Sequence, residues 1–301
     1  MGGNMKNERL MHIRRRVLSL LLSALLIMTT VIPVSAADAK TPSRSIAIIF
    51  DNSGSMYVGA NATAWCRATY AIEVFASMMN DGDILSVYPM YKVEVEGKTY
   101  SDTNPVVLTN QNSGSIRTMY TKKAEDTPIE VIDHAFEGIN ATTADEKWLI
   151  VLTDGAEFYE NGKGLGEGEP TKKALTDRLT KYNNDVNVMY LGMGSVAAQP
   201  EINGSMKHYT AAAKNTANVL GELTTMCNLI FGRDSLETNG KTISFDIPMS
   251  KLIVFVQGNN ISAVQVKADD GKPVGETIST LQPRYGEKGA GNYPVNVDTS
   301  L

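Results

Sequence analysis

Cysteine and histidine are scarce in this chain of 301 residues, which contains two cysteines and three histidines. Cys66 and Cys227 lie far apart, and no pair of cysteine or histidine residues has the close spacing of a zinc site. His12 belongs to the N-terminal segment, whereas His134 and His208 fall in an expected helix and an expected strand. We therefore expect no zinc centre, and we interpret the two later histidines as structural.

An excess of basic residues is also lacking. The chain has 28 Lys and Arg residues against 33 Asp and Glu residues, which gives a net charge of −5. Residues 1–36 hold five of the basic residues and one of the acidic residues, so the remaining chain carries a net charge of −9. An acidic protein is a poor partner for nucleic acid or anionic lipid, and neither is expected here.

No long apolar run follows residue 36, so we expect no membrane insertion of the mature chain. Near the N-terminus, Arg14-Arg15-Arg16 precedes the mostly apolar run 17–28, and Val34-Ser35-Ala36 supplies the small residues of a cleavage site. We interpret residues 1–36 as a signal peptide and residues 37–44 as a linker, with an uncleaved anchor as the alternative. The protein is therefore expected to be exported, and to be extracellular or at the cell surface.

Motifs of common enzyme classes are missing. No Gly-x-Ser-x-Gly elbow surrounds Ser53 or Ser55. Asp51 lacks the second aspartate two residues later that a haloacid dehalogenase phosphatase requires, because Ser53 occupies that position. The glycine-rich stretch 161–168 does not leave a strand directly and runs into Glu169-Pro170, so we interpret it as a loop rather than a phosphate site. We expect no enzymatic activity.

What the sequence does contain is an apolar run, residues 45–50, that ends in Asp51-Asn52-Ser53-Gly54-Ser55. A continuous apolar run is typical of a buried parallel strand, and ligands bind at the carboxyl ends of such strands. Asp51, Ser53 and Ser55 place three oxygen side chains on one turn. Oxygen ligands favour hard cations such as Mg²⁺, Mn²⁺ or Ca²⁺, although this turn alone offers too few of them.

Two other segments contain matching oxygen ligands. The apolar run 147–152 also ends in an acid, Asp154, which is followed by glycine. Between the two runs, Thr127 precedes Pro128 at the expected start of a helix. Thr121 and the pair Thr142-Thr143 are alternatives to Thr127, which would otherwise be an ordinary N-cap residue.

These three parts, in this order, resemble the metal-ion-dependent adhesion site of von Willebrand factor type A domains. The resemblance covers about residues 45–232. It implies that Asp51, Ser53, Ser55, Thr127 and Asp154 hold a divalent cation, with Mg²⁺ as the first choice and Mn²⁺ or Ca²⁺ as alternatives.

The same resemblance implies a function. One coordination position is left for a carboxylate from a protein ligand, so the expected activity is cation-dependent adhesion to a protein or matrix. A structural or sensing subunit of a cell-envelope assembly is the alternative. In the resembled fold the helices of Cys66 and Cys227 are neighbours, so both a disulfide and two buried thiols remain open.

Strand and helix patterns alternate as far as residue 232, which predicts an α/β fold. The expected architecture is a Rossmann-like, doubly wound, mostly parallel sheet with helices on both faces. Helices are expected at 64–79, 127–139, 171–182 and 217–231, and further strands at 83–90, 106–109, 186–191 and 208–211. A hairpin is expected to turn at 96–98.

After residue 233 short strand patterns at 241–247, 251–256 and 263–267 have no helices between them. This pattern predicts a β-rich, sandwich-like domain over 233–301. Val295 and Val297 alternate with polar residues up to the end of the chain, so we expect the domain to be incomplete, as in a fragment of a longer protein.

Overall fold

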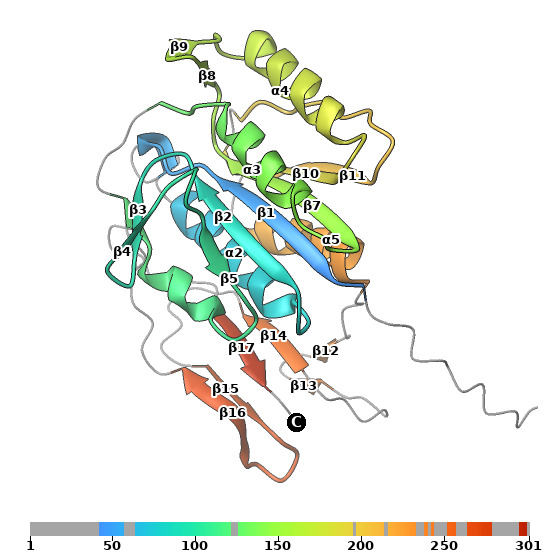
Figure 1. Cartoon of the computed structure of the whole chain (residues 1–301). Helices are drawn as coiled ribbons and strands as arrows, with labels where there is room; N and C mark the ends of the chain where they lie inside the picture. The colour runs from blue at the N-terminus through green and yellow to red at the C-terminus, as the bar shows by residue number, and fades with distance from the viewer. Residues whose placement is uncertain are drawn as a thin grey trace, which may run out of the picture. The chain divides into compact units, whose positions relative to one another are not determined.

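The computed structural model describes ten ranges of the chain, namely 42–56, 64–121, 126–194, 197–213, 216–232, 238–239, 242–243, 252–256, 264–278 and 295–299. Within them lies a six-stranded sheet with the strand order β11-β10-β7-β1-β2-β5 (Figure 1). Its five parallel strands pair in that order, and β5 is an antiparallel edge strand. The strands are β1 (Arg44–Phe50), β2 (Ile84–Pro89), β5 (Val106–Leu108), β7 (Glu146–Thr153), β10 (Asn187–Gly192) and β11 (His208–Ala212).

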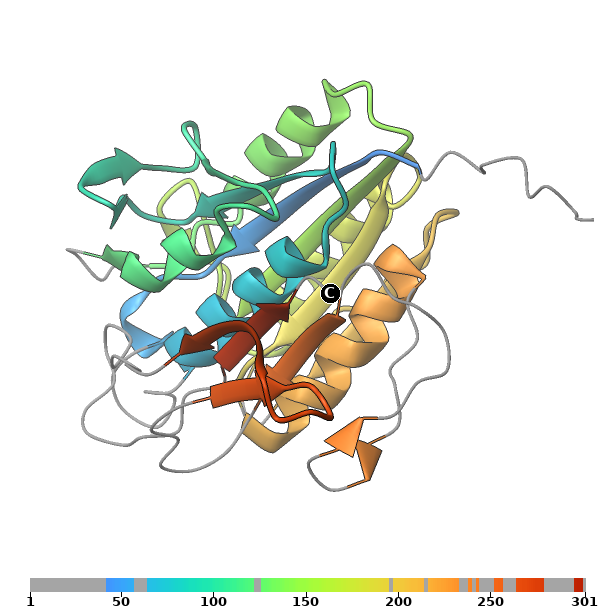
Figure 2. The same cartoon turned by 90° about the horizontal axis from the view of Figure 1, so that it is seen from below.

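Side chains alternate between the two faces of this sheet. Ile46, Ile48 and Phe50 of β1 pack in a core cluster with α2 (Ala64–Met78) and α5 (Thr216–Phe231). Ala47 and Ile49 face the opposite cluster, which includes α3 (Val131–Asn140) and α4 (Glu169–Tyr182). Figure 2 separates the layers, with α3 on one side of the sheet and α2 and α5 on the other. The predicted α/β fold with helices on both faces is confirmed.

The start of α3 was predicted wrongly. The helix begins at Val131 with Glu130 as its N-cap, not at Thr127. The residues before it pair instead with β8 (Tyr159–Glu160). Tyr159 N–H donates to the Thr127 carbonyl at 2.9 Å, and Ile129 N–H donates to the Tyr159 carbonyl at 2.9 Å. These long-range backbone bonds hold Thr127 outside the helix, so it is not the N-cap.

Two hairpins are built on turns with positive φ. The predicted one joins β3 (Val93–Val95) and β4 (Lys98–Tyr100) through Glu96 at φ 49° and Gly97 at φ 76°. The other turns at Asn161 and Gly162, with φ of 51° and 71°, and pairs β8 with β9 (Lys163–Gly164). Two successive positive φ angles match the tight turn that suits twisted strands. Part of the glycine-rich stretch is thus a hairpin rather than a plain loop. The remaining short strand, β6 (Tyr120–Thr121), pairs with β3.

The C-terminal part forms antiparallel pairs, as expected. They are β14 (Leu252–Val256) with β17 (Val295–Thr299), β15 (Val264–Lys267) with β16 (Pro273–Ile278), and β12 (Thr238–Asn239) with β13 (Thr242–Ile243). Residues 244–251, which include most of one expected strand, lie outside the described residues. The domain boundary after residue 232 and closure into a sandwich stay predictions.

The predicted signal peptide and most of the linker also lie outside the described residues. None of the helices in the described part of the chain has both the length and the apolar character needed to cross a membrane.

Candidate functional site

The candidate site lies where β1 and β7 end side by side. Phe50 pairs with Leu152 in parallel register, and the Asp51 N–H continues the ladder by donating to the Leu152 carbonyl at 3.0 Å. Asp51 and Asp154 therefore leave neighbouring strands at the same edge of the sheet. This is the edge at which open α/β sheets bind ligands.

Hydrogen bonds connect four of the five predicted ligands in one chain. The Ser53 N–H donates to Asp51 Oδ1 at 3.0 Å, and the hydroxyls of Ser53 and Ser55 lie 3.1 Å apart. Ser55 Oγ then donates to Asp154 Oδ1 at 2.9 Å. Asp51, Ser53 and Asp154 are buried, whereas Ser55 is exposed. The cluster thus extends from the core to the surface.

Asp51 lies in an unfavourable electrostatic environment. Burial and the nearby Asp154 carboxylate raise its pKa to about 6, although hydrogen bonds from Thr153 and Ser53 act in the opposite direction. Among the described residues, no lysine, arginine or histidine forms an ion pair with Asp51. Two adjacent buried carboxylates are costly without a counter-charge, and a divalent cation would supply one.

The donor set is compatible with a hard cation. No three His, Cys, Asp or Glu side chains within the described ranges gather as a metal cluster. The candidate site instead combines two carboxylates with hydroxyls, and oxygen ligands of this kind suit Mg²⁺ or Ca²⁺ and not zinc. Asp51, Ser53, Ser55 and Asp154 would hold such an ion. Metal binding by these residues stays a prediction.

Thr127 is connected to the candidate site through the loop that follows Asp154. Its side chain is buried, and its Oγ1 donates to the Glu157 carbonyl at 2.5 Å, which connects it to the loop after Asp154. No hydrogen bond among the described residues joins Thr127 to the other four predicted ligands. Its lone pairs leave it able to bind an ion.

The alternatives to Thr127 differ in position. Thr142 donates to the Ile139 carbonyl at 2.7 Å just after α3, and the strand that follows, β7, runs from there toward Asp154. The Thr142-Thr143 pair therefore precedes the opposite end of β7. The side chain of Thr121 lies outside the described residues.

Sequence reasoning missed two residues that shape the site. Thr153 Oγ1 donates to Asp51 Oδ2 at 2.5 Å and accepts from the Gly155 N–H at 2.8 Å. Asn52 binds the Tyr91 backbone twice, through its Nδ2 to the carbonyl at 3.0 Å and its Oδ1 to the N–H at 2.9 Å. Each is adjacent in sequence to a predicted ligand, but nothing in its residue type indicates a partner so far along the chain.

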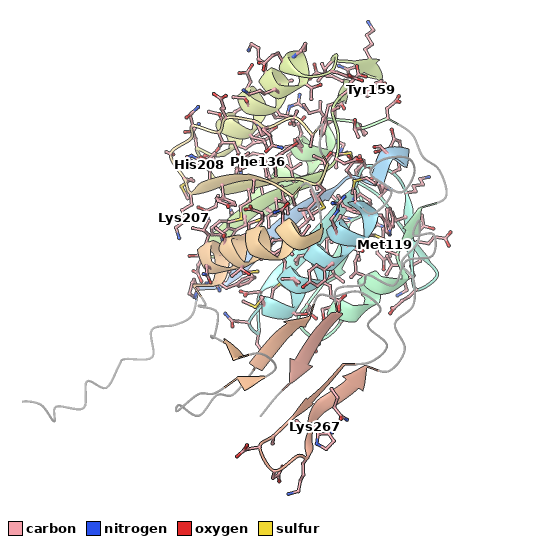
Figure 3. All side chains as sticks on the ribbon, turned by 180° about the vertical axis from the view of Figure 1, so that it is seen from behind. Met119, Phe136, Tyr159, Lys207, His208 and Lys267 are labelled. Carbon is pink, nitrogen blue, oxygen red and sulfur yellow. The ribbon has the colours of Figure 1, made fainter. Side chains whose placement is uncertain are left out.

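Acidic and aromatic groups lie around the cluster. Burial, Asp126 and Asp51 raise the pKa of Tyr91 to about 12. Asp126 and Glu157 also raise the pKa of Tyr159, which Figure 3 places at the hairpin end of the molecule. Both phenols therefore stay neutral and able to donate hydrogen bonds. Met56, which follows Ser55 directly, is buried in the core.

The remaining predicted residues lie elsewhere. His134 Nδ1 pairs with Asp102 at 2.9 Å, and His208 is exposed at the start of β11, well away from Tyr159 in Figure 3. Cys227 is buried in α5, which contacts α2 as expected. The side chain of Cys66 lies outside the described residues, so the disulfide stays a prediction.

Comparison with known proteins gives similarity to solved structures only. No family model and no curated protein matches the chain. The PilB minor pilin from Streptococcus sanguinis is 14% identical with a TM-score of 0.40, covering 64% of this chain and 62% of that one. The vWF domain of the type V pili tip protein Mfa5 from Porphyromonas gingivalis is 19% identical with a TM-score of 0.29, covering 40% and 41%. The pilus adhesin SpaC from Lactobacillus rhamnosus GG is 14% identical with a TM-score of 0.40, covering 86% and 37%. The chain spans less than two thirds of the length of each of these three proteins.

Proposed function

We propose that this chain is an exported binding module that engages an acidic group of a protein or matrix ligand through a divalent cation. The cation, with Mg²⁺ as the first choice and Mn²⁺ or Ca²⁺ as alternatives, is held by Asp51, Ser53, Ser55, Thr127 and Asp154. The observation that carries the proposal is the chain of hydrogen bonds from buried Asp51 through Ser53 and exposed Ser55 to Asp154, built on two adjacent strand ends.

The charges of the site support this function. Two carboxylates neutralise a divalent ion, and neutral hydroxyls complete its coordination without reducing its attraction for a further anion. A carboxylate from a partner can then approach an acidic protein, because the bound ion reverses the local charge. Such a desolvated charge contact can dominate an interface.

The exposed side of the site determines the direction from which a ligand approaches. Ser55 is the only exposed member of the five predicted ligands, since the other four are buried. A ligand therefore approaches from the Ser55 side and reaches the ion without entering the core. The proposed activity is binding and includes no chemical turnover.

Thermal melting of the full chain in EDTA, Mg²⁺, Mn²⁺ or Ca²⁺ tests the metal site. A cation that binds only the folded state stabilises it by about 2.7 kcal/mol at a hundredfold excess over Kd. We expect this rise in Tm for the unaltered protein and its loss in an Asp51→Ala, Ser53→Ala variant.

The matched control replaces one aspartate and one serine away from the carboxyl ends of β1 and β7. Asp185 and Ser205 are both exposed, so an Asp185→Ala, Ser205→Ala variant should keep the full rise in Tm. Unchanged melting of the unaltered protein at millimolar cation would contradict the proposed metal site.

Binding to an immobilised matrix preparation tests the ligand. Saturable binding that EDTA and the Asp51→Ala, Ser53→Ala variant both abolish is the expected result. Co-purification with cell-envelope proteins that persists in EDTA would instead favour a structural or sensing subunit of an envelope assembly.

A further inference from the structure

Tyr190 lies on β10, the strand that pairs directly with β7. Residues Tyr190, Val151 and Ile49 form one row across β10, β7 and β1, and Tyr88 of β2 extends the row on the other side. Tyr88 and Tyr190 both belong to the core cluster on the α3 and α4 face. The row thus places two buried tyrosines on the same face, one on each side of β1 and β7.

The ring of Tyr190 extends along its strand toward the candidate site. A side chain on Gly192 would place its Cβ 3.4 Å from Tyr190 Cε1, so the ring passes over this glycine, two residues nearer the carboxyl end. Gly192 pairs with Thr153, whose hydroxyl donates to Asp51. The Tyr190 ring therefore lies close to the Gly192–Thr153 pair, in which Thr153 is the residue that donates to the Asp51 carboxylate.

The hydroxyl of Tyr190 has no hydrogen-bond partner among the residues that the structure describes, although the side chain is 0% exposed. Buried tyrosine hydroxyls normally find a partner, because an unsatisfied buried polar group is unfavourable. Burial, and to a smaller extent the Asp51 and Asp154 carboxylates, raise the pKa of this phenol, so it stays neutral. The hydroxyl is therefore a neutral donor at the end of a ring that lies over Gly192, the register partner of Thr153.

We propose that Tyr190 is a positioning residue for the loaded metal site. When a divalent cation is bound, its single O–H donates to the Asp51 carboxylate, directly or through one water, and so orients that carboxylate toward the ion. This inference rests on the proposed cation-dependent function. In the arrangement described, the known donors to these carboxylates are Thr153, the Ser53 N–H and Ser55, so the phenol is an additional donor.

The test compares Tyr190→Phe with Tyr88→Phe in the full chain. Both variants remove one hydroxyl from the same core row, but the pKa of Tyr88 is raised by burial alone, without any carboxylate. Isothermal titration with MgCl₂ measures cation affinity, and melting in EDTA measures stability without the ion.

We expect Tyr190→Phe to weaken Mg²⁺ binding about tenfold, as the loss of one hydrogen bond in the loaded state predicts. Its Tm in EDTA should not fall, because the hydroxyl has no partner there. Tyr88→Phe should bind Mg²⁺ like the unaltered protein.

Two results would overturn the inference and leave the proposed function standing. One is unchanged Mg²⁺ affinity in Tyr190→Phe. The other is an equal drop in Tm with and without Mg²⁺, which would make the hydroxyl a general structural group. If the unaltered protein binds no cation, the proposed function itself fails, and this inference fails with it.

Discussion

Thr153 links Asp51 to the backbone just after Asp154 through a single hydroxyl. It donates to Asp51 Oδ2 and accepts from the Gly155 N–H just after Asp154. The bond to Asp51 lowers the pKa of that carboxyl, against the larger effects of burial and Asp154. Thr153 thereby favours the ionised form of Asp51, which a cation requires.

Thr153→Val tests this role, because valine keeps the shape of the side chain and removes the hydroxyl. An Asp51 oxygen and the Gly155 N–H would lose their partner, so we expect the free energy of unfolding to fall by about 1–3 kcal/mol. Urea denaturation in EDTA measures the change. Thr153→Ser retains the hydroxyl and is the control, and an equal loss in both variants would show that packing of the methyl group matters instead.

At the scale of elements, the two faces of the sheet differ in how closely a helix glycine approaches its neighbours. Gly138 of α3 lies against the phenol of Tyr88 on β2, and a methyl group there would overlap with the Tyr88 ring. Gly221 of α5 has nothing within 4 Å of the place its Cβ would occupy. The same residue type therefore permits close packing in one helix and only adds chain freedom in the other.

Alanine substitutions at these two glycines should have opposite signs. Gly138→Ala should lower the free energy of unfolding by about 1–3 kcal/mol through overpacking. Gly221→Ala should raise it by about 0.5–1 kcal/mol, because alanine restricts the unfolded chain and favours the helix. Chemical denaturation of the two variants, side by side, measures both changes. Stabilisation by Gly138→Ala would contradict the close approach.

For the whole molecule, Arg44 joins the beginning and the end of the described α/β part. Its Nε donates to Glu146 Oε2 at 3.0 Å and to the Ile230 carbonyl at 2.9 Å, and its Nη1 donates to the Pro42 carbonyl at 3.3 Å. The guanidinium also lies over the Phe231 ring, 5.6 Å from its centroid. One buried side chain thus ties β1, β7 and the last turn of α5 together.

Arg44→Met should destabilise the protein by about 3–5 kcal/mol, because it leaves the carboxylates around Arg44 without their buried partner. Methionine preserves much of the apolar length, so the loss reports on the charge. The control is Lys173→Met, which breaks an exposed pair with Asp177 and should cost under about 0.5 kcal/mol. Urea denaturation measures both, and similar losses in the two variants would contradict the role of Arg44.

Strand positions and the acids at their ends follow from local sequence. The runs 46–50 and 148–152 are continuously apolar, and within two residues of each comes the aspartate that the structure places at the same edge of the sheet. Burial on both faces demands such runs, and a parallel sheet brings its carboxyl ends together. These features could be read without knowledge of any distant contact.

Local sequence could not predict the start of α3, the hydrogen-bond partners of Asp51 or the position of Tyr190. Thr127 is kept out of the helix by its backbone bond to Tyr159. Thr153 reaches Asp51 because β7 pairs with β1, and the Tyr190 ring lies over the register partner of Thr153 because β10 pairs with β7. Strand order and register depend on packing between segments that are far apart in the chain. Local conformational propensity does not depend on that packing, so the donors around the two aspartates are determined only when the sheet is assembled.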